Sequence, residues 1–178
     1  MRKWSELKQA ILDKLFLNEQ EAINQGYLSK FQYLTNECLN IIANGVKPYV
    51  TSVEVTGNAN TIIRMPDNFL SFSEFTYYDD ISFISDDEIR IDRDGTHHIT
   101  YNATYEQITK EIIDNDSVLN IPQSVLITIP TYVASQLLSQ DDIQRSTILR
   151  NEFELMLSRL DTTIIYEEQH YHSIGEWY

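Results

Sequence analysis

The sequence predicts an α+β fold, in which an antiparallel bundle of about four helices carries an inserted antiparallel β subdomain and an extended C-terminal tail. Two observations carry this prediction. Apolar residues recur at helical spacing in residues 4–17, 28–42 and 121–160. Residues 49–105 instead alternate and are rich in β-branched and aromatic side chains, which is typical of strands.

The chain ends in DTTIIYEEQHYHSIGEWY, which holds no Lys or Arg and is unusually aromatic. We therefore expect one domain over residues 1–165, with the β insert at 49–105, and a docking tail over residues 166–178. Below, residues 166–178 are called the tail.

Residues 121–160 hold the most regular pattern, and they predict two helices packed as a hairpin. Pro122 suits a first helical turn, whereas Pro130 removes a hydrogen bond in mid-run and predicts a bend or two short helices. The residues expected to face the core are Val125, Leu126, Ile129, Tyr132, Val133 and Leu137, followed by Ile143, Thr147, Ile148, Phe153, Leu157 and Leu160.

The connection between these two runs contains a start signal for the second helix. Ser139 stands three residues ahead of Asp142, which is close to a capping box. Asp141 and Arg145 are four residues apart and are expected to pair. We expect the second helix to begin near Asp142.

Two further helices are expected before the β insert, joined by a polar stretch at residues 18–25. The second ends at Asn44-Gly45, with Pro48 just beyond. The lone Cys38 cannot form an internal disulfide and is expected to be a small buried hydrophobe in a reducing compartment. The predicted buried stripes are Trp4, Leu7, Ile11, Leu12, Leu15 and Phe16, and then Leu28, Phe31, Thr35, Cys38, Leu39 and Ile42.

The β insert predicts two hairpins. In the first, YVTSVEV and TIIRM flank the turn-forming GNAN. In the second, Asp94-Gly95 lies between alternating strands at residues 89–93 and 97–103. Three aromatic-rich fragments lie between the hairpins, at residues 69–72, 75–78 and 81–84.

Charge weighs against a nucleic-acid-binding protein. The chain carries 13 Lys and Arg against 27 Asp and Glu, for a net charge of −14. Because DNA is held largely through phosphate contacts from basic side chains, we expect no affinity for it.

The N-terminal residues lead directly into an amphipathic pattern without the apolar core of a secretory signal, and no stretch is long and apolar enough to span a membrane.

Candidate chemistry is sparse. His170-x-His172 would share a strand face and could share a metal, but no Cys supplements it, and His97-His98 is the only other pair. Asp92-x-Asp94-Gly95 resembles the start of a calcium loop without its later ligands, so a turn explains it better. The acids Asp79-Asp80 and Asp86-Asp87-Glu88 are typical of solvated loops. We expect no cofactor, no metal and no enzymatic activity.

The tail is too aromatic for a freely solvated end. Burying its four large rings would yield roughly 20 kcal/mol at about 25 cal/mol/Å². Ordering thirteen residues at roughly 1.5 kcal/mol each costs a similar amount, so one tail binds weakly, whereas many copies held together bind firmly. Two interpretations stay open: the tail folds back as a strand on its own domain, or it docks into a partner. The rings are Tyr166, Tyr171, Trp177 and Tyr178.

Short motifs in both helical parts carry a resemblance to a known family. They are IPTYVASQ from Ile129, the pair Asp141-Asp142 and RNEFE from Arg150, together with WSEL from Trp4, YLSKF from Tyr27 and NE from Asn36. In order and spacing they resemble the head–tail adaptor proteins (head completion or connector proteins) of tailed double-stranded DNA bacteriophages. The resemblance covers about half of the chain, and its motifs are packing and cap residues.

The resemblance implies a structural virion protein that is made in the cytoplasm of the host bacterium and located at the junction of capsid and tail. Its copies would form a homo-oligomeric ring, usually a dodecamer, between the portal protein and the next neck or tail component. DNA would pass through the ring without being specifically bound.

Members of the family commonly reach into the portal with their C-terminal segment, whereas the large β insert departs from many of them. We accordingly expect the insert to contact the next tail component. Portal docking is assigned to Tyr166, Tyr171, His172, Ile174, Trp177 and Tyr178, and the tail-side contact to Phe75, Tyr77, Tyr78 and Phe83.

Two other classes of function stay open. A carbohydrate- or protein-binding module would use the aromatic side chains and acids of the β insert, and soluble glycans would then shift its melting temperature. A carboxylate-dependent hydrolase would need paired carboxylates or histidines in a pocket.

Overall fold

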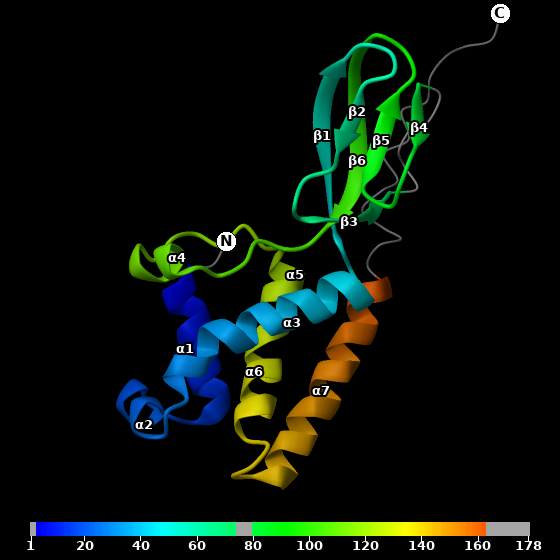
Figure 1. Ribbon diagram of the computed structural model, residues 1–178. Coiled ribbons are helices and arrows are strands. Elements are labelled where there is room, and N and C mark those ends of the chain that lie inside the picture. Colours follow the sequence, from blue (N-terminus) through cyan, green and yellow to red (C-terminus); the bar gives the residue numbers. More distant parts are fainter. Residues whose placement is uncertain (1–2, 74–79, 163–178) are drawn as a thin grey trace, which may run out of the picture. The chain divides into compact units, whose positions relative to one another are not determined.

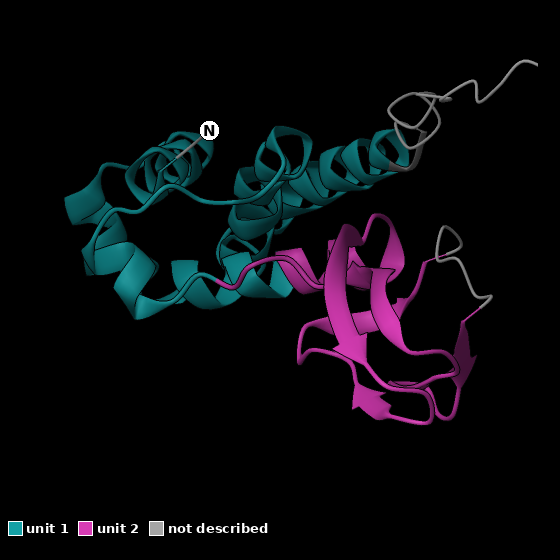
Figure 2. Ribbon diagram, turned by 90° about the horizontal axis from the view of Figure 1, so that it is seen from above, with its two compact units in different colours: residues 1–38, 108–178 teal, residues 39–107 magenta. Residues whose placement is uncertain are grey.

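The computed structural model describes residues 3–73 and 80–162, which combine helices and strands (Figure 1). The chain divides into two compact units, unit 1 with residues 1–38 and 108–178, and unit 2 with residues 39–107 (Figure 2). All strands that the structure describes belong to unit 2. The predicted α+β class is confirmed. The division into a domain over 1–165 and a tail over 166–178 stays a prediction.

Unit 1 is built around α6, which is buried along almost its whole length. α6 packs against α1 and α7, and of its nine residues Gln136 alone is exposed. The ring of Tyr132 on α6 lies 5.0 Å, centroid to centroid, from that of Phe153 on α7. The helices of unit 1 are α1 (Trp4–Leu15), α2 (Glu19–Asn24), a 3-10 turn (Leu28–Lys30), the first half of α3 (Phe31–Gly45), α4 (Lys110–Asp114), α5 (Gln123–Leu126), α6 (Ile129–Leu137) and α7 (Ile143–Thr162).

Pro130 divides the first half of residues 121–160 into two short helices, as predicted. α5 ends at Leu126, and α6 begins at Ile129 with Pro130 in its first turn, where a missing N–H costs little. Within the break, the Thr128 hydroxyl donates to the Val125 carbonyl at 2.8 Å. Pro122 stands just before α5, one position earlier than expected.

The core-facing residues predicted between Val125 and Leu137 are all buried, which confirms that part of the prediction. The core-facing residues predicted on α7 are partly wrong. Ile143 and Ile148 are 70% and 59% exposed, and Thr147 is exposed as well. Leu149 takes the inward position instead, followed by Phe153 and then Leu160. These inward residues share one helical face, from which residue 148 is turned by about 100°.

Phe16 was predicted to face the core and is 83% exposed. α1 ends at Leu15, and Phe16 adopts the left-handed conformation (φ 58°) that closes the helix. The chain therefore turns away from the helix axis before Phe16 can extend the buried stripe. The other five residues of that stripe are buried.

The stretch predicted to be a polar joint is helix α2. Its start is a capping box, since the Asn18 side chain accepts from the Glu21 N–H at 2.9 Å and the Glu21 carboxylate accepts from the Asn18 N–H at 2.8 Å. Cys38 on α3 is fully buried as expected, and burial raises the pKa of its thiol.

α7 begins at Ile143, close to its predicted start, but the predicted capping box and the predicted ion pair are not formed. The Asp142 carboxylate accepts from the Arg145 backbone N–H at 3.0 Å and so caps the helix. The Ser139 hydroxyl donates to the Gln136 carbonyl and takes no part in the cap. Asp141 accepts from the Tyr27 hydroxyl, and the Arg145 guanidinium reaches α1 instead.

Unit 2 contains two antiparallel three-stranded sheets, with orders β1-β6-β3 and β2-β5-β4. Residues buried between them form its core, joined by half-buried rings such as Phe72. The strands are β1 (Tyr49–Gly57), β2 (Ile62–Arg64), β3 (Phe69–Phe72), β4 (Ile81–Phe83), β5 (Glu88–Ile91) and β6 (Gly95–Ala103). The core residues are Met65, Ile81, Ile89, Ile99, Tyr101 and Ala103.

Both predicted hairpins are wrong. β1 pairs with β6 over its whole length, from Tyr49 opposite Ala103 to Gly57 opposite Gly95, and β2 pairs with β5. The chain changes sheet four times, after β1, β2, β3 and β5. A Cβ on Gly57 would lie 2.7 Å from Ile91 Cδ1, so a larger residue there would displace the end of the Ile91 side chain.

Across the residues that the structure describes, none of the helices has both the length and the apolar character that a membrane span requires.

The packing of α6 against α7 predicts a large cost for truncating either side. Leu137→Ala or Phe153→Ala should lower the free energy of unfolding by about 2–5 kcal/mol, because each leaves a cavity. Ile143→Ala, on the exposed side of α7, is the matched control and should change it by less than about 0.5 kcal/mol. Urea unfolding followed by circular dichroism measures all three, and equal midpoints would contradict the packing.

Candidate interaction surface

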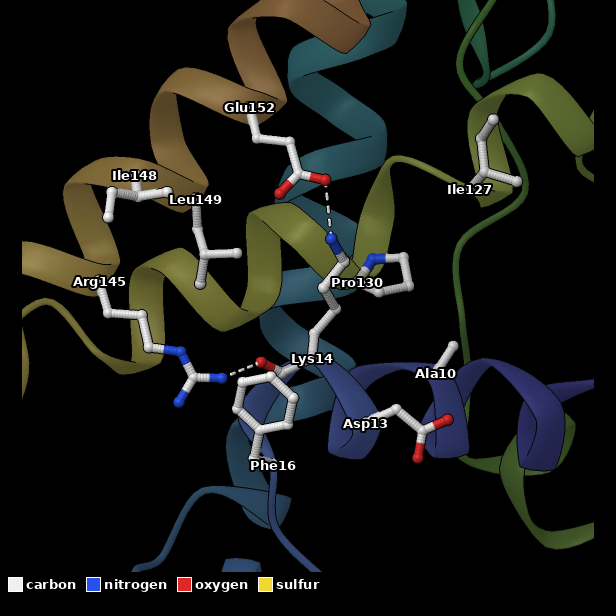
Figure 3. Close-up of a pocket in the computed structure, with 10 residues that line it drawn as sticks. All are labelled: Ala10, Asp13, Lys14, Phe16, Ile127, Pro130, Arg145, Ile148, Leu149 and Glu152. Carbon is white, nitrogen blue, oxygen red and sulfur yellow. Dashed lines mark hydrogen bonds and ion pairs between the residues drawn. The ribbon is translucent and has the colours of Figure 1, made fainter.

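A groove of about 620 Å³ lies on unit 1 between α1 and α7 (Figure 3). Leu149 and Pro130 line it from buried positions, whereas Ile148, Ile127 and Phe16 remain 59%, 44% and 83% exposed. Exposed apolar side chains that gather in one place mark contact surfaces more often than isolated ones do. The lining residues are Ala10, Asp13, Lys14, Phe16, Ile127, Pro130, Arg145, Ile148, Leu149 and Glu152.

Arg145 connects α7 to the C-terminal end of α1. Its guanidinium donates to the Leu15 carbonyl at 3.2 Å and to the Lys14 carbonyl. The last carbonyls of a helix have no partner within the helix and carry its partial negative charge, so Arg145 caps α1 from outside. The guanidinium also lies 4.3 Å from the centroid of the Phe16 ring.

The positive charge of Arg145 is not neutralised by a carboxylate among the described residues, because its side-chain partners are two carbonyls and a ring. The other charges of the groove are engaged. Lys14 Nζ lies 2.7 Å from Glu152 Oε1 and links α1 to α7, and Asp13 accepts from the Gln9 amide at 2.8 Å. The charged residues that line the groove therefore sum to zero, but Arg145 is not paired with either of the two carboxylates.

Of the residues assigned to partners from the sequence, the structure describes one. The six tail residues, together with Phe75, Tyr77 and Tyr78, lie outside the described residues. Phe83 is on β4, is 47% exposed, and packs its ring against Phe72 at a centroid distance of 4.5 Å.

The acids singled out in the sequence hold turns and neighbouring strands. The Asp94 carboxylate accepts from the Ala59 N–H at 2.6 Å and so joins the loop after β5 to the loop after β1. The Asp87 carboxylate accepts from Arg64 at 3.0 Å, and this hydrogen bond lowers the pKa of Asp87. A catalytic acid would need a raised pKa, so Asp87 is a poor candidate for that role.

The histidines that the structure describes are not placed as metal ligands. His97 Nε2 lies 3.0 Å from the Arg93 carbonyl oxygen, whereas His98 Nε2 lies 3.7 Å from the Glu54 carboxylate. Over residues 3–73 and 80–162, no three His, Cys, Asp or Glu side chains come together as a metal site. The His170-x-His172 pair lies outside these ranges.

The chain matches no model of a known protein family and no curated protein.

The groove was missed from the sequence because Phe16 and Ile148 were both assigned to the core. One local signal was present, since Asn18-x-x-Glu21 resembles a capping box and indicates that a new helix begins close after Phe16. The contact between Arg145 and α1 joins residues 130 positions apart. No local pattern indicates such a contact.

Arg145→Ala should lower the free energy of unfolding by about 1.5–3 kcal/mol, because the carbonyls at the end of α1 lose a charged donor. Lys14→Ala removes only a half-exposed ion pair and should cost about 0–1 kcal/mol. Thermal unfolding of both variants beside the parent protein measures the difference. An Arg145→Ala variant as stable as Lys14→Ala would show that Arg145 is not a helix cap.

Proposed function

We propose that the protein is a head–tail adaptor of a tailed double-stranded DNA bacteriophage. In this proposal, a bundle of about four antiparallel helices with an inserted β subdomain assembles as a ring between the portal and the next neck or tail component. The observation that carries the proposal is the amount of large apolar surface left on the helical unit. Phe16, Ile127 and Ile148 flank the groove, and Ile143 and Leu155 are exposed beyond it on α7.

The positions of the motif residues support the proposal. IPTYVASQ covers most of α6, the buried centre of unit 1, and RNEFE places the buried Phe153 on α7. Trp4, Tyr27 and Phe31 in the front-half motifs are buried as well. The motifs thus hold packing residues of one helical unit, which is what a shared fold would require.

The charge of the chain also agrees with an adaptor ring. A wall that lets DNA pass without holding it should not be basic, and the net charge of this chain is −14. The ring would act in the virion at the capsid–tail junction after synthesis in the bacterial cytoplasm. Its role is structural, with neither a reaction nor a cofactor.

Two partner contacts complete the proposal. The tail would enter the portal with its aromatic residues as anchors, since buried aromatic side chains carry much of the energy of protein interfaces. The β subdomain would face the next neck or tail component, with Phe83 among its contacts. The described acids give the hydrolase alternative no support, because Asp87 and Asp92 are each paired with an arginine.

The proposed function is tested by imaging the full chain. Negative-stain images of the concentrated protein, alone and mixed with portal-bearing capsids, should show rings of about twelve copies at the portal vertex. Deleting residues 166–178 should leave the far-UV circular dichroism spectrum nearly unchanged but abolish attachment to the capsids. Protein that never forms rings, with or without capsids, would refute the proposal.

Free protein should leave duplex DNA unbound at physiological salt, because −14 net charge provides no broad phosphate-contacting surface. A mobility-shift titration measures this. Submicromolar binding would contradict the adaptor function and reveal a basic site.

A further inference from the structure

We propose that the groove between α1 and α7 binds the aromatic tail of its own chain. The proposal goes beyond the adaptor function, because it assigns a second site to the tail on the protein itself. It selects one of the two interpretations that the sequence leaves open, namely that the tail folds back on its own domain, and it replaces an added strand by aromatic side chains seated in a helical groove.

The lining of the groove fits aromatic side chains. Phe16 and Ile148 are each more than half exposed, and they stand beside the buried Leu149 and Pro130 (Figure 3). Aromatic rings bury large areas and prefer offset or edge-to-face contacts with other rings, which the exposed Phe16 ring offers. The tail holds four such rings within thirteen residues.

Charge favours the tail over a neutral occupant. The Arg145 guanidinium is bonded to neutral carbonyls and stacked on Phe16, so its charge remains available to a carboxylate. The tail carries Glu167, Glu168 and Glu176 and no Lys or Arg. An arginine side chain can bind carboxylates and can also stack on aromatic rings. The tail contains acidic and aromatic side chains close together, so it offers Arg145 both kinds of partner. Of the two groove carboxylates, Glu152 is paired with Lys14, and Asp13 lies apart from the Arg145 guanidinium (Figure 3).

The length of the chain permits binding to the same molecule. Glu152 in the groove is ten residues before Thr162, where α7 ends. The helix between these two residues is about 15 Å long. The fifteen residues from Thr162 to Trp177 span up to about 50 Å when extended. The tail can therefore turn back along α7 and reach the groove with residues to spare.

Attachment to the same chain also makes a weak site effective. The burial gain of the tail and the cost of ordering it are similar, so the free tail would bind poorly from solution. A tail connected to the groove by a short segment acts at an effective concentration of the order of millimolar, so it fills the groove wherever the intrinsic Kd is below about 1 mM.

The experiment uses the full chain with Trp177→p-benzoyl-phenylalanine, irradiated at low protein concentration and mapped by mass spectrometry. Crosslinks to residues 10–16 or 145–152 within a monomer are the expected result. Crosslinks confined to unit 2, no crosslinks at all, or crosslinks found only in dimers would overturn the proposal. The last result would indicate a second copy as the source of the bound tail.

Matched variants locate the site. Ile148→Glu and Arg145→Gln should each lower the crosslink yield to the groove about tenfold, a change that corresponds to about 1.4 kcal/mol. Leu155→Glu is the control, because Leu155 is 63% exposed on the same helix and does not line the groove. Its yield should be unchanged. Circular dichroism of each variant shows that it is folded, and equal yields in all three would overturn the proposal.

These measurements need neither capsids nor rings. A negative crosslinking result therefore leaves the adaptor function standing, and a failure to form rings leaves the groove assignment standing.

Discussion

Burial of α6 between α1 and α7 is the constraint on which the helical unit depends. Buried polar groups on such a helix need hydrogen-bond partners, and most of them find one close by, although the Thr131 hydroxyl has none among the described residues. The Ser135 hydroxyl donates to the Tyr132 carbonyl at 2.7 Å, and the Ser146 hydroxyl of α7 donates to the Ser135 carbonyl at 2.8 Å. The same constraint explains the break before Pro130, because a single straight helix would leave a missing hydrogen bond in its interior.

The groove is a consequence of that arrangement. α1 and α7 both pack on α6, and the groove remains between them. Two contacts from α7 cross it: Arg145 reaches the last carbonyls of α1, and Glu152 reaches Lys14. The first satisfies backbone groups that would otherwise need water, whereas the second is a half-exposed ion pair of little energetic value. Arg145 is therefore the contact that fixes the end of α1 beside α7.

Most helical spans could be predicted from the sequence, because helical spacing and the proline and glycine signals are local. The break at Pro130 and the burial of Cys38 follow from such signals. Strand pairing could not be predicted in the same way. Alternation in β1 or β6 shows which side chains share a face, but a strand alternates identically whichever partner it has. The groove was beyond prediction for a related reason, since it depends on where Phe16 leaves α1 and on an arginine from α7.

The two proposed sites for the tail would compete, and the competition has a physical advantage. A tail held in its own groove would keep four aromatic rings and the exposed Phe16 covered, which would limit unwanted association between copies. Because the contact between the tail and its own groove is weak, the tail would leave the groove easily. A portal that offers equivalent pockets around a ring gains from each additional tail, whereas each groove holds one tail at a fixed effective concentration. Release would then favour a complete ring over a single copy, and attachment would depend on assembly.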